Sequence, residues 1–67
     1  MTFQQTKAWY IDLEHATNLA KEHRFLSDRE EIANQMIERT IKYRGEEYAK
    51  ALFRKANQRV KYRFYDI

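Results

Sequence analysis

The 67-residue sequence contains no cysteine, no proline and only one glycine, Gly45. Without cysteine, neither a disulfide nor a thiolate metal site can stabilise the fold. Without proline, and with a single glycine, the chain has few of the residues that form β-turns and glycine-rich phosphate-binding loops. These absences favour a fold made of α-helices.

Long apolar runs are also missing. The longest covers residues 8–11, whereas a membrane-spanning helix needs about 18 apolar residues or more. The N-terminal residues lack the basic stretch followed by an apolar one that marks a secretory signal. We therefore expect a soluble, cytoplasmic protein with no membrane partner.

Charge is abundant and unevenly placed. Residues 1–47 hold seven Lys or Arg against nine Asp or Glu, a balance of −2, whereas residues 48–67 hold six against one, a balance of +5. The whole chain carries a net charge of +3 with neutral histidines. A basic field at one end raises the association rate with acidic partners, which include both nucleic acids and acidic protein surfaces.

Aromatic residues are numerous for a chain of this size, with four Phe, one Trp and five Tyr. That content argues against disorder and for a folded core. A domain this small draws a stability margin of only about 3–5 kcal/mol from its core. We therefore expect a single helical domain over residues 1–67, with a basic, aromatic C-terminal segment at 48–67 and with dimerisation as a way to complete the core.

Apolar residues recur at helical spacing in three segments. This pattern predicts an all-α, small three-helix bundle with helices over about residues 2–24, 28–44 and 46–64. The expected inner faces are Trp9, Leu13, Ala16, Leu19 and Ala20, then Ile32, Ala33, Met36, Ile37, Thr40, Ile41 and Tyr43, then Ala49, Leu52, Phe53, Ala56 and Val60. The residues expected to meet in one core are Trp9, Leu13, Ile37, Leu52 and Phe53.

Capping chemistry predicts the helix boundaries. Thr2 with Gln5, and Ser27 with Glu30, fit capping boxes in which the hydroxyl accepts a backbone N–H of the first turn. Gly45 follows a basic turn and fits the glycine that ends a helix in a left-handed conformation. We therefore expect helix breaks around Ser27 and at Gly45.

The C-terminal sequence NQRVKYRFYDI, residues 57–67, alternates basic and apolar residues in its middle part. Val60, Phe64 and Ile67 continue the helical spacing of the third segment, whereas Val60, Tyr62 and Phe64 have the spacing of a strand. A lone strand would need a second chain to pair with. We favour the helix, with its apolar residues inward, and keep the strand as the alternative.

Residues with catalytic or metal-binding chemistry are sparse. Asp12, His15 and Glu22 share part of the first helix, but such spacings are common by chance and a solvated face explains them. Ser27 is explained as a helix cap, and no glycine-flanked hydroxyl is present. We expect no catalytic residue, no metal site and no cofactor, and hence a protein that is not an enzyme.

Asp12 also falls among the apolar positions of the first helix. A buried carboxylate without a partner is costly, so Asp12 should meet an Arg or Lys, a Tyr hydroxyl or a helix N-terminus. Two arrangements remain open. We favour a position at the margin of the core with access to water over a buried pair between helices or subunits.

One side of the third helix and the tail combine aromatic and basic residues. The candidate binding surface consists of Tyr48, Lys55, Arg59, Lys61, Tyr62 and Arg63. This composition suits a protein interface, phosphate contacts with base stacking, or a solvated helix face. No zinc-finger, KH or RNP motif is present, and the region around Gly45 matches a helix-turn-helix poorly.

The surplus of aromatic rings decides between these interpretations, because a fold this small hides only some of them and exposed rings form interfaces. We expect a small non-enzymatic helical protein that acts through protein–protein contacts, as a regulator or inhibitor of a larger partner with an acidic surface. We also expect a homodimer or another homo-oligomer. The alternative is a nucleic-acid-binding protein that uses the third helix and the tail.

Overall fold

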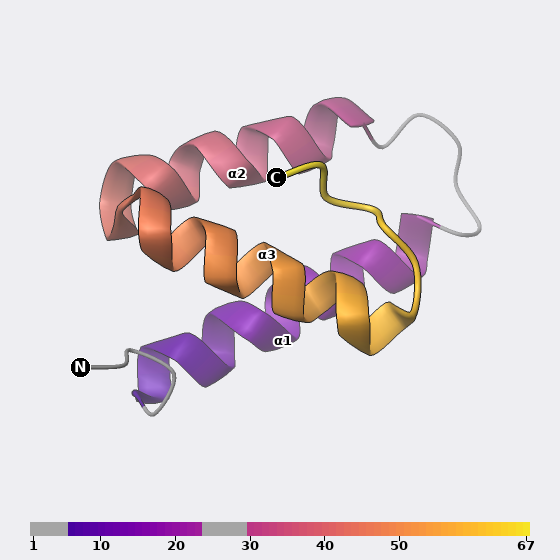
Figure 1. Ribbon diagram of the computed structural model, residues 1–67, viewed down its shortest axis with the longest axis horizontal. Helices are drawn as coiled ribbons and strands as arrows, with labels where there is room; N and C mark the ends of the chain where they lie inside the picture. Colours follow the sequence, from indigo (N-terminus) through magenta and orange to yellow (C-terminus); the bar gives the residue numbers. More distant parts are fainter. Residues whose placement is uncertain (1–5, 24–29) are drawn as a thin grey trace.

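The computed structural model describes residues 6–23 and 30–67, which contain three α-helices. Helix α1 covers Lys7–His23, α2 covers Glu30–Arg44 and α3 covers Glu46–Val60 (Figure 1). No strand occurs in these described ranges. The predicted all-α three-helix bundle is confirmed.

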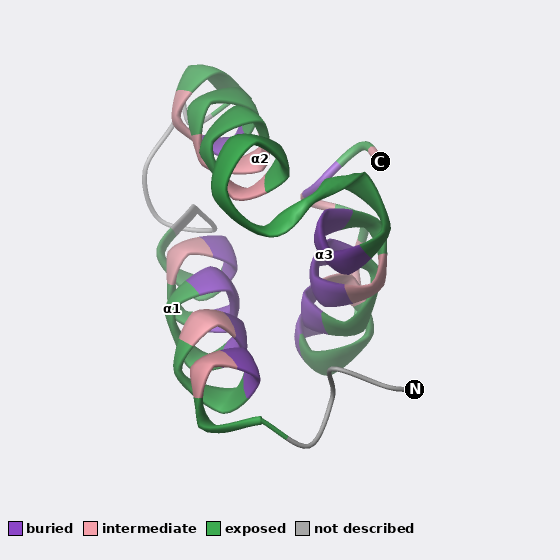
Figure 2. Ribbon diagram, turned by 90° about the vertical axis from the view of Figure 1, so that its left-hand side faces the viewer, coloured by how far each residue is buried: buried purple, intermediate pink, exposed green. Residues whose placement is uncertain are grey.

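Helix α3 is the centre of the bundle. It packs against both α1 and α2, whereas α1 and α2 make few contacts with each other. Figure 2 shows the buried residues of α1 and α3 turned toward each other, while most of α2 is exposed. In the described part of the chain, no helix has the length and apolar content that crossing a membrane requires.

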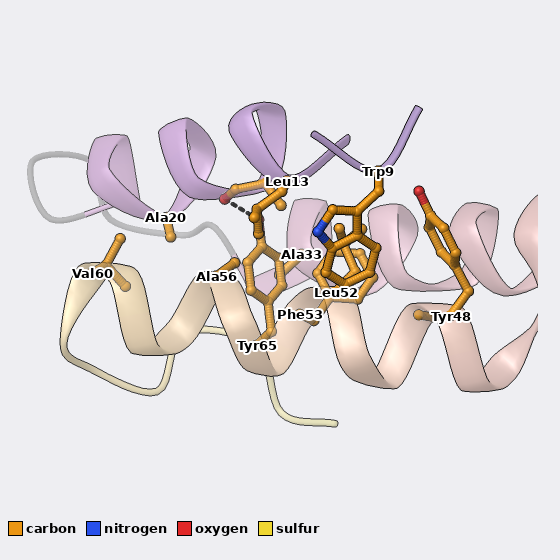
Figure 3. Close-up of a cluster of buried hydrophobic side chains, with 12 residues drawn as sticks. Trp9, Leu13, Ala20, Ala33, Tyr48, Leu52, Phe53, Ala56, Val60 and Tyr65 are labelled. Carbon is orange, nitrogen blue, oxygen red and sulfur yellow. Dashed lines mark hydrogen bonds between the residues drawn. The ribbon is translucent and has the colours of Figure 1, made fainter. Parts of the chain in front are cut away.

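The core lies mainly between α1 and α3 (Figure 3). Its buried residues are Trp9, Leu13, Ala16, Ala20, Ala33, Tyr48, Ala49, Leu52, Phe53, Ala56, Val60 and Tyr65. Of the predicted core, Trp9, Leu13, Leu52 and Phe53 are confirmed, and Ile37 packs against this cluster as a partly buried residue.

Helix α2 contributes less to the core than its sequence pattern predicts. Ala33 is the one buried residue of α2. Ile41 and Tyr43, which we expected on the inner face, are 38% and 73% exposed, so the prediction was wrong at these positions. The reason is that α2 packs against α3 with few contacts to α1, and only a narrow side of it is covered.

Helix α1 begins at Lys7, and the start predicted near residue 2 lies outside the described residues. The Trp9 backbone N–H donates to Oγ1 of Thr6 at 3.1 Å, which is the interaction of an N-cap residue with the third helical residue. Thr6 therefore caps α1. Thr2, Gln5 and Ser27 lie outside the described residues, so their capping boxes stay predictions.

The predicted break at Gly45 is confirmed. The expected left-handed helical conformation was wrong, because Gly45 has φ 100° and ψ 158°, an extended positive-φ conformation that glycine alone adopts without strain. Its N–H donates to Ile41 O at 3.0 Å and its own carbonyl accepts from Ala49 N at 3.1 Å, so it joins the end of α2 to the start of α3. A Cβ added at Gly45 would meet no atom within 4 Å. The requirement for glycine is therefore one of backbone conformation and not of space.

Helix α3 ends at Val60, so the predicted extension to about residue 64 was wrong. Lys61 leaves the helix with a left-handed backbone, φ 60° and ψ 32°. Residues 61–67 form neither helix nor strand, and the strand alternative was therefore also wrong.

Two backbone hydrogen bonds close this helix end. Lys61 N donates to Gln58 O and Tyr62 N donates to Asn57 O, both at 3.3 Å. This pair of bonds is the Schellman arrangement, which usually has glycine where this chain has Lys61. It turns the chain back along α3, as Figure 1 shows.

Candidate functional site

The C-terminal segment is held against α3 by one amide side chain. Asn57 Nδ2 donates to Tyr65 O at 2.8 Å, and Asn57 Oδ1 accepts from Phe64 N at 3.0 Å and from Tyr65 N at 2.9 Å. Asn57 thus satisfies three backbone groups that no helix or strand would satisfy there. The segment after α3 is consequently a fixed part of the fold.

This segment places Tyr65 in the core, where the residue is 0% exposed. Its hydroxyl donates to Ala16 O of α1 at 2.7 Å, and the oxygen lies 3.6 Å from Met36 Sδ of α2. Its ring centroid lies 4.5 Å from that of Phe53 in α3 (Figure 3). Burial raises the pKa of the Tyr65 hydroxyl. One side chain therefore touches all three helices.

The other apolar residues of the tail are less deeply placed. Phe64 and Ile67, which we expected to face inward, are partly buried and pack against the core. The Tyr62 hydroxyl donates to Ala20 O of α1. The Tyr62 side chain therefore points toward α1 and is half-buried.

Asp12 has two of the partners that its position predicts. Tyr48 donates its hydroxyl to Asp12 Oδ2 at 2.6 Å, and Arg44 Nε lies 3.2 Å from the same oxygen. The Asp12 side chain is 28% exposed, so the pair between helices sits at the margin of the core. Burial, and then the hydrogen bond to Asp12, raise the pKa of the Tyr48 hydroxyl to about 12.

Tyr48 also packs edge-on against Trp9, with ring centroids 5.3 Å apart and an interplanar angle of 83°. Figure 3 shows the two rings side by side at one end of the buried cluster. Together with Asp12 and Arg44, this pair ties the start of α3 to α1 and to the end of α2.

An open groove of about 320 Å³ lies beside this cluster. Helices α1 and α2 form its sides, and α3 contributes Leu52 and Phe53. The residues that line it are Asp12, His15, Met36, Arg39, Thr40, Tyr43, Arg44, Leu52 and Phe53. The groove arises because α1 and α2 both pack on α3 and make few contacts with each other.

Exposed large apolar side chains occur on α1 and α2 only, as far as the structure describes the chain. Tyr43 is the most exposed at 73% and lines the groove. Ile11, 50% exposed, lies one helical turn before His15 of the groove. Tyr10 is 58% exposed and lines a different depression, shared with Lys21 and Arg59.

The predicted binding surface is divided by the structure. Lys55, Arg59, Lys61 and Arg63 are exposed, and Arg63 Nη2 lies 3.0 Å from Asp66 Oδ1. The two aromatic members of the surface, Tyr48 and Tyr62, instead bond to Asp12 and to Ala20 O. Tyr48 is buried and Tyr62 is half-buried, so the exposed part of this surface consists mainly of its cations.

Residue types that bind metal ions are scattered over the part of the chain that the structure describes. Among the described residues, no three His, Cys, Asp or Glu side chains lie close enough together to hold a metal ion. His15 and Asp12 line the same groove, but Asp12 is already bonded to Tyr48 and Arg44.

Sequence reasoning missed Asn57 and Tyr65. Continued helical spacing would place Tyr65 on the outer side of α3, about 180° from the middle of its buried face. The turn at Lys61 reverses that direction. The available signal was Asn57 itself, since an Asn side chain near a helix end often bonds to the backbone of the following turn.

Comparisons with known proteins found no similar protein. A scan against protein-family models, a search of curated proteins and a search of solved structures each gave no match. Inferences about function therefore rest on the residues and contacts of this chain alone.

Proposed function

We propose that this chain is a small non-enzymatic binding protein that acts through protein–protein contacts, as a regulator or inhibitor of a larger protein. The observation that carries the proposal is the groove between α1 and α2, with Tyr43 on its rim and 73% exposed. An exposed aromatic ring beside a concave apolar surface is the kind of anchor on which protein interfaces concentrate their binding energy.

Among the described residues, Tyr43 makes no contact that holds the core together. Its ring contacts Lys42, whose Nζ lies 5.7 Å from the ring centroid, and neither residue belongs to the buried cluster. A tyrosine ring presents a large apolar area, and leaving it in water costs free energy that an interface would recover. Tyr43 is therefore the strongest candidate for a contact residue.

The charges around Tyr43 favour an acidic partner. Arg39 and Arg44 line the groove with Tyr43, and Lys42 is adjacent in sequence. Arg44 is paired with Asp12, whereas Arg39 makes no hydrogen bond or ion pair within the described ranges. A partner that presents an apolar side chain flanked by carboxylates would complement this rim.

A second copy of this chain is part of the same proposal. A homodimer would cover exposed apolar surface that a chain of 67 residues leaves open. We expect sedimentation equilibrium to give a dimer mass for the wild-type chain that falls to the monomer mass on Tyr43→Ser substitution.

The test of partner binding is site-specific photocrosslinking in the native cells, with the photoreactive residue at position 43 and, as a matched control, at position 10. We expect a discrete adduct with a larger protein from position 43 only. With that partner purified, Tyr43→Ser should weaken binding by about 2 kcal/mol or more, and Tyr10→Ser should not. Equal crosslinking from both positions, or equal affinity of both variants, would contradict the proposal.

A further inference from the structure

Helix α3 presents a second surface, which consists of cations. Lys50, Arg54, Lys55 and Lys61 are all exposed; we call them the basic face. Lys50 and Arg54 are four residues apart and lie on one side of α3, Lys55 follows Arg54, and Lys61 is the first residue after the helix. From Lys50 to its end at Val60, α3 runs for about 15 Å, at about 1.5 Å per residue.

Few acidic residues compensate this charge. No Asp or Glu occurs from residue 48 to residue 65. Lys50 is paired with Glu46 at 3.3 Å, an exposed pair at the start of α3. Arg54, Lys55 and Lys61 have no ion pair with any described residue. These three cations are thus available to an external anion.

The basic face lacks what a protein interface normally needs. The exposed large apolar side chains of the described residues are Tyr10, Ile11, Ile41 and Tyr43, and all of them belong to α1 or α2. Protein interfaces are anchored by buried aromatic and aliphatic residues, whereas contacts to a phosphate backbone need only cations and hydrogen-bond donors. The composition of this face therefore fits a polyanion whose charges are regularly spaced.

The tail distinguishes a duplex from a single strand. Proteins that hold single strands stack bases on exposed aromatic rings. None of the three rings of the tail is fully exposed, because Tyr65 is buried and Tyr62 and Phe64 are half-buried against the core. A duplex offers phosphates without unstacked bases, at about one charge per 1.7 Å of its axis, so a face of this length meets several of them.

We propose that the basic face of α3 docks on the phosphate backbone of a nucleic-acid duplex without reading its sequence. This surface is separate from the groove between α1 and α2, so the inference does not depend on the proposed function. Lys50, Arg54, Lys55 and Lys61 contact phosphate oxygens, and the released counterions supply the affinity.

The test is fluorescence anisotropy with a mixed-sequence DNA duplex at several salt concentrations, using the full chain. The variant Arg54→Gln/Lys55→Gln/Lys61→Gln should lose affinity at least about tenfold at low salt. Each lost phosphate contact should also reduce the slope of log affinity against log salt by about 0.9, so the triple variant should lose about 2 to 3 units of slope.

A matched variant, Lys7→Gln/Lys21→Gln/Lys42→Gln, removes the same charge from exposed positions on α1 and α2. We expect it to keep the wild-type slope. The charge-conserving variant Arg54→Lys/Lys55→Arg/Lys61→Arg should also bind like the wild type. Equal losses of duplex affinity in the two triple Gln variants would mean that net charge alone attracts the duplex, and the proposal would be wrong.

Two further outcomes would overturn the proposal. One is the absence of duplex binding by the wild type at low salt. The other is tighter binding of a polyglutamate peptide than of the duplex, lost in the same triple variant, which would assign the face to an acidic protein. Circular dichroism checks that each variant is folded. If the triple variant unfolds, the double variants Arg54→Gln/Lys55→Gln and Lys7→Gln/Lys21→Gln make the same comparison, because they leave Lys61 at the helix end unchanged.

Discussion

The tripeptide Lys-Tyr-Arg occurs twice in this chain, at residues 42–44 at the end of α2 and at residues 61–63 just after α3. In the first copy Tyr43 is 73% exposed. In the second copy Tyr62 is half-buried and donates its hydroxyl to a carbonyl of α1. Identical residues therefore have opposite roles, and composition alone does not assign a side chain to a surface.

The difference arises from where each copy leaves its helix. Residues 42–44 complete α2, and the positive φ falls on Gly45 after them. In the second copy the positive φ falls on the lysine itself, Lys61, so the tyrosine that follows is already in the returning chain. The position of the positive-φ residue relative to the tripeptide therefore decides whether its tyrosine ring points toward the core or toward solvent.

The largest expected effect comes from removing Tyr65, the buried residue that follows the turn at Lys61. Tyr65→Ala leaves a cavity where all three helices meet and should lower the free energy of unfolding by about 3–5 kcal/mol. Tyr43→Ala, at the exposed ring, should change it by less than about 0.5 kcal/mol. Urea unfolding followed by circular dichroism measures both. Similar losses in the two variants would show that the tail does not close the core.

High pH should also destabilise the fold, because it deprotonates the buried Tyr48. The pKa of Tyr48 in the folded protein is about 12, above the value of about 10 in an unfolded chain. The protonated Tyr48 hydroxyl therefore contributes its full stabilisation below about pH 10, and this contribution is lost as the pH rises through about 12. Urea unfolding across this range should show a falling free energy of unfolding, and Tyr48→Phe should make the fall shallower. An unchanged profile in Tyr48→Phe would contradict this assignment.

Asn57 tests how the returning segment is held. Asn57→Ala leaves the backbone groups of Phe64 and Tyr65 without their partner and should cost about 1–3 kcal/mol of stability. Gln58→Ala, at the next and exposed position, should cost less than about 0.5 kcal/mol. Thermal unfolding separates the two. If Asn57→Ala matched Gln58→Ala, packing alone would hold the segment.

The two tyrosines of the repeated tripeptide can be compared directly by removing their hydroxyls. Tyr62→Phe loses the bond to Ala20 O and should destabilise the fold by about 1 kcal/mol. Tyr43→Phe should have almost no effect on stability, because its hydroxyl makes no hydrogen bond with any described residue. Equal midpoints of chemical unfolding would contradict the inward role of Tyr62.

The smallest expected effect concerns the turn itself. Lys61 holds a left-handed conformation that costs a non-glycine residue about 1–2 kcal/mol. Lys61→Gly should therefore raise the free energy of unfolding by about 0.5–1 kcal/mol after the greater flexibility of unfolded glycine is counted. Gly45→Ala, at φ 100°, should have the opposite sign. A loss of stability in Lys61→Gly would mean that its side chain supports the turn.

Local patterns were enough to predict the helices and the break at Gly45. The inner face of α3, from Ala49 to Val60, follows helical periodicity because each apolar residue there packs inward. The partners of Asp12 were predicted by type, since a carboxylate near a core needs a donor. These inferences succeed because each one depends on residues close in sequence or on one group's cost of burial.

The tail and the candidate binding surface were not predictable in the same way. The direction of Tyr65 depends on a carbonyl of Ala16, 49 residues away in sequence, and on a left-handed residue that is not glycine. Tyr48 was placed beside the inner face of α3, and its burial depends on Trp9 of α1 packing against that side. Periodicity within one helix carries no information about either contact.

The bond from Tyr65 to Ala16 also bears on the kinetics of folding. Most contacts in a small helical bundle are local, and such bundles fold quickly because little loop-closure entropy is lost before contacts form. Here the tail must find α1 across a separation of 49 residues, and Tyr62 repeats the linkage across 42. Helix α1 cannot detach without breaking the hydrogen bonds that Tyr62 and Tyr65 donate to it. We therefore expect the amides of α1 and of α3 to exchange as one cooperative unit, and the thinly covered α2 to open at lower free energy.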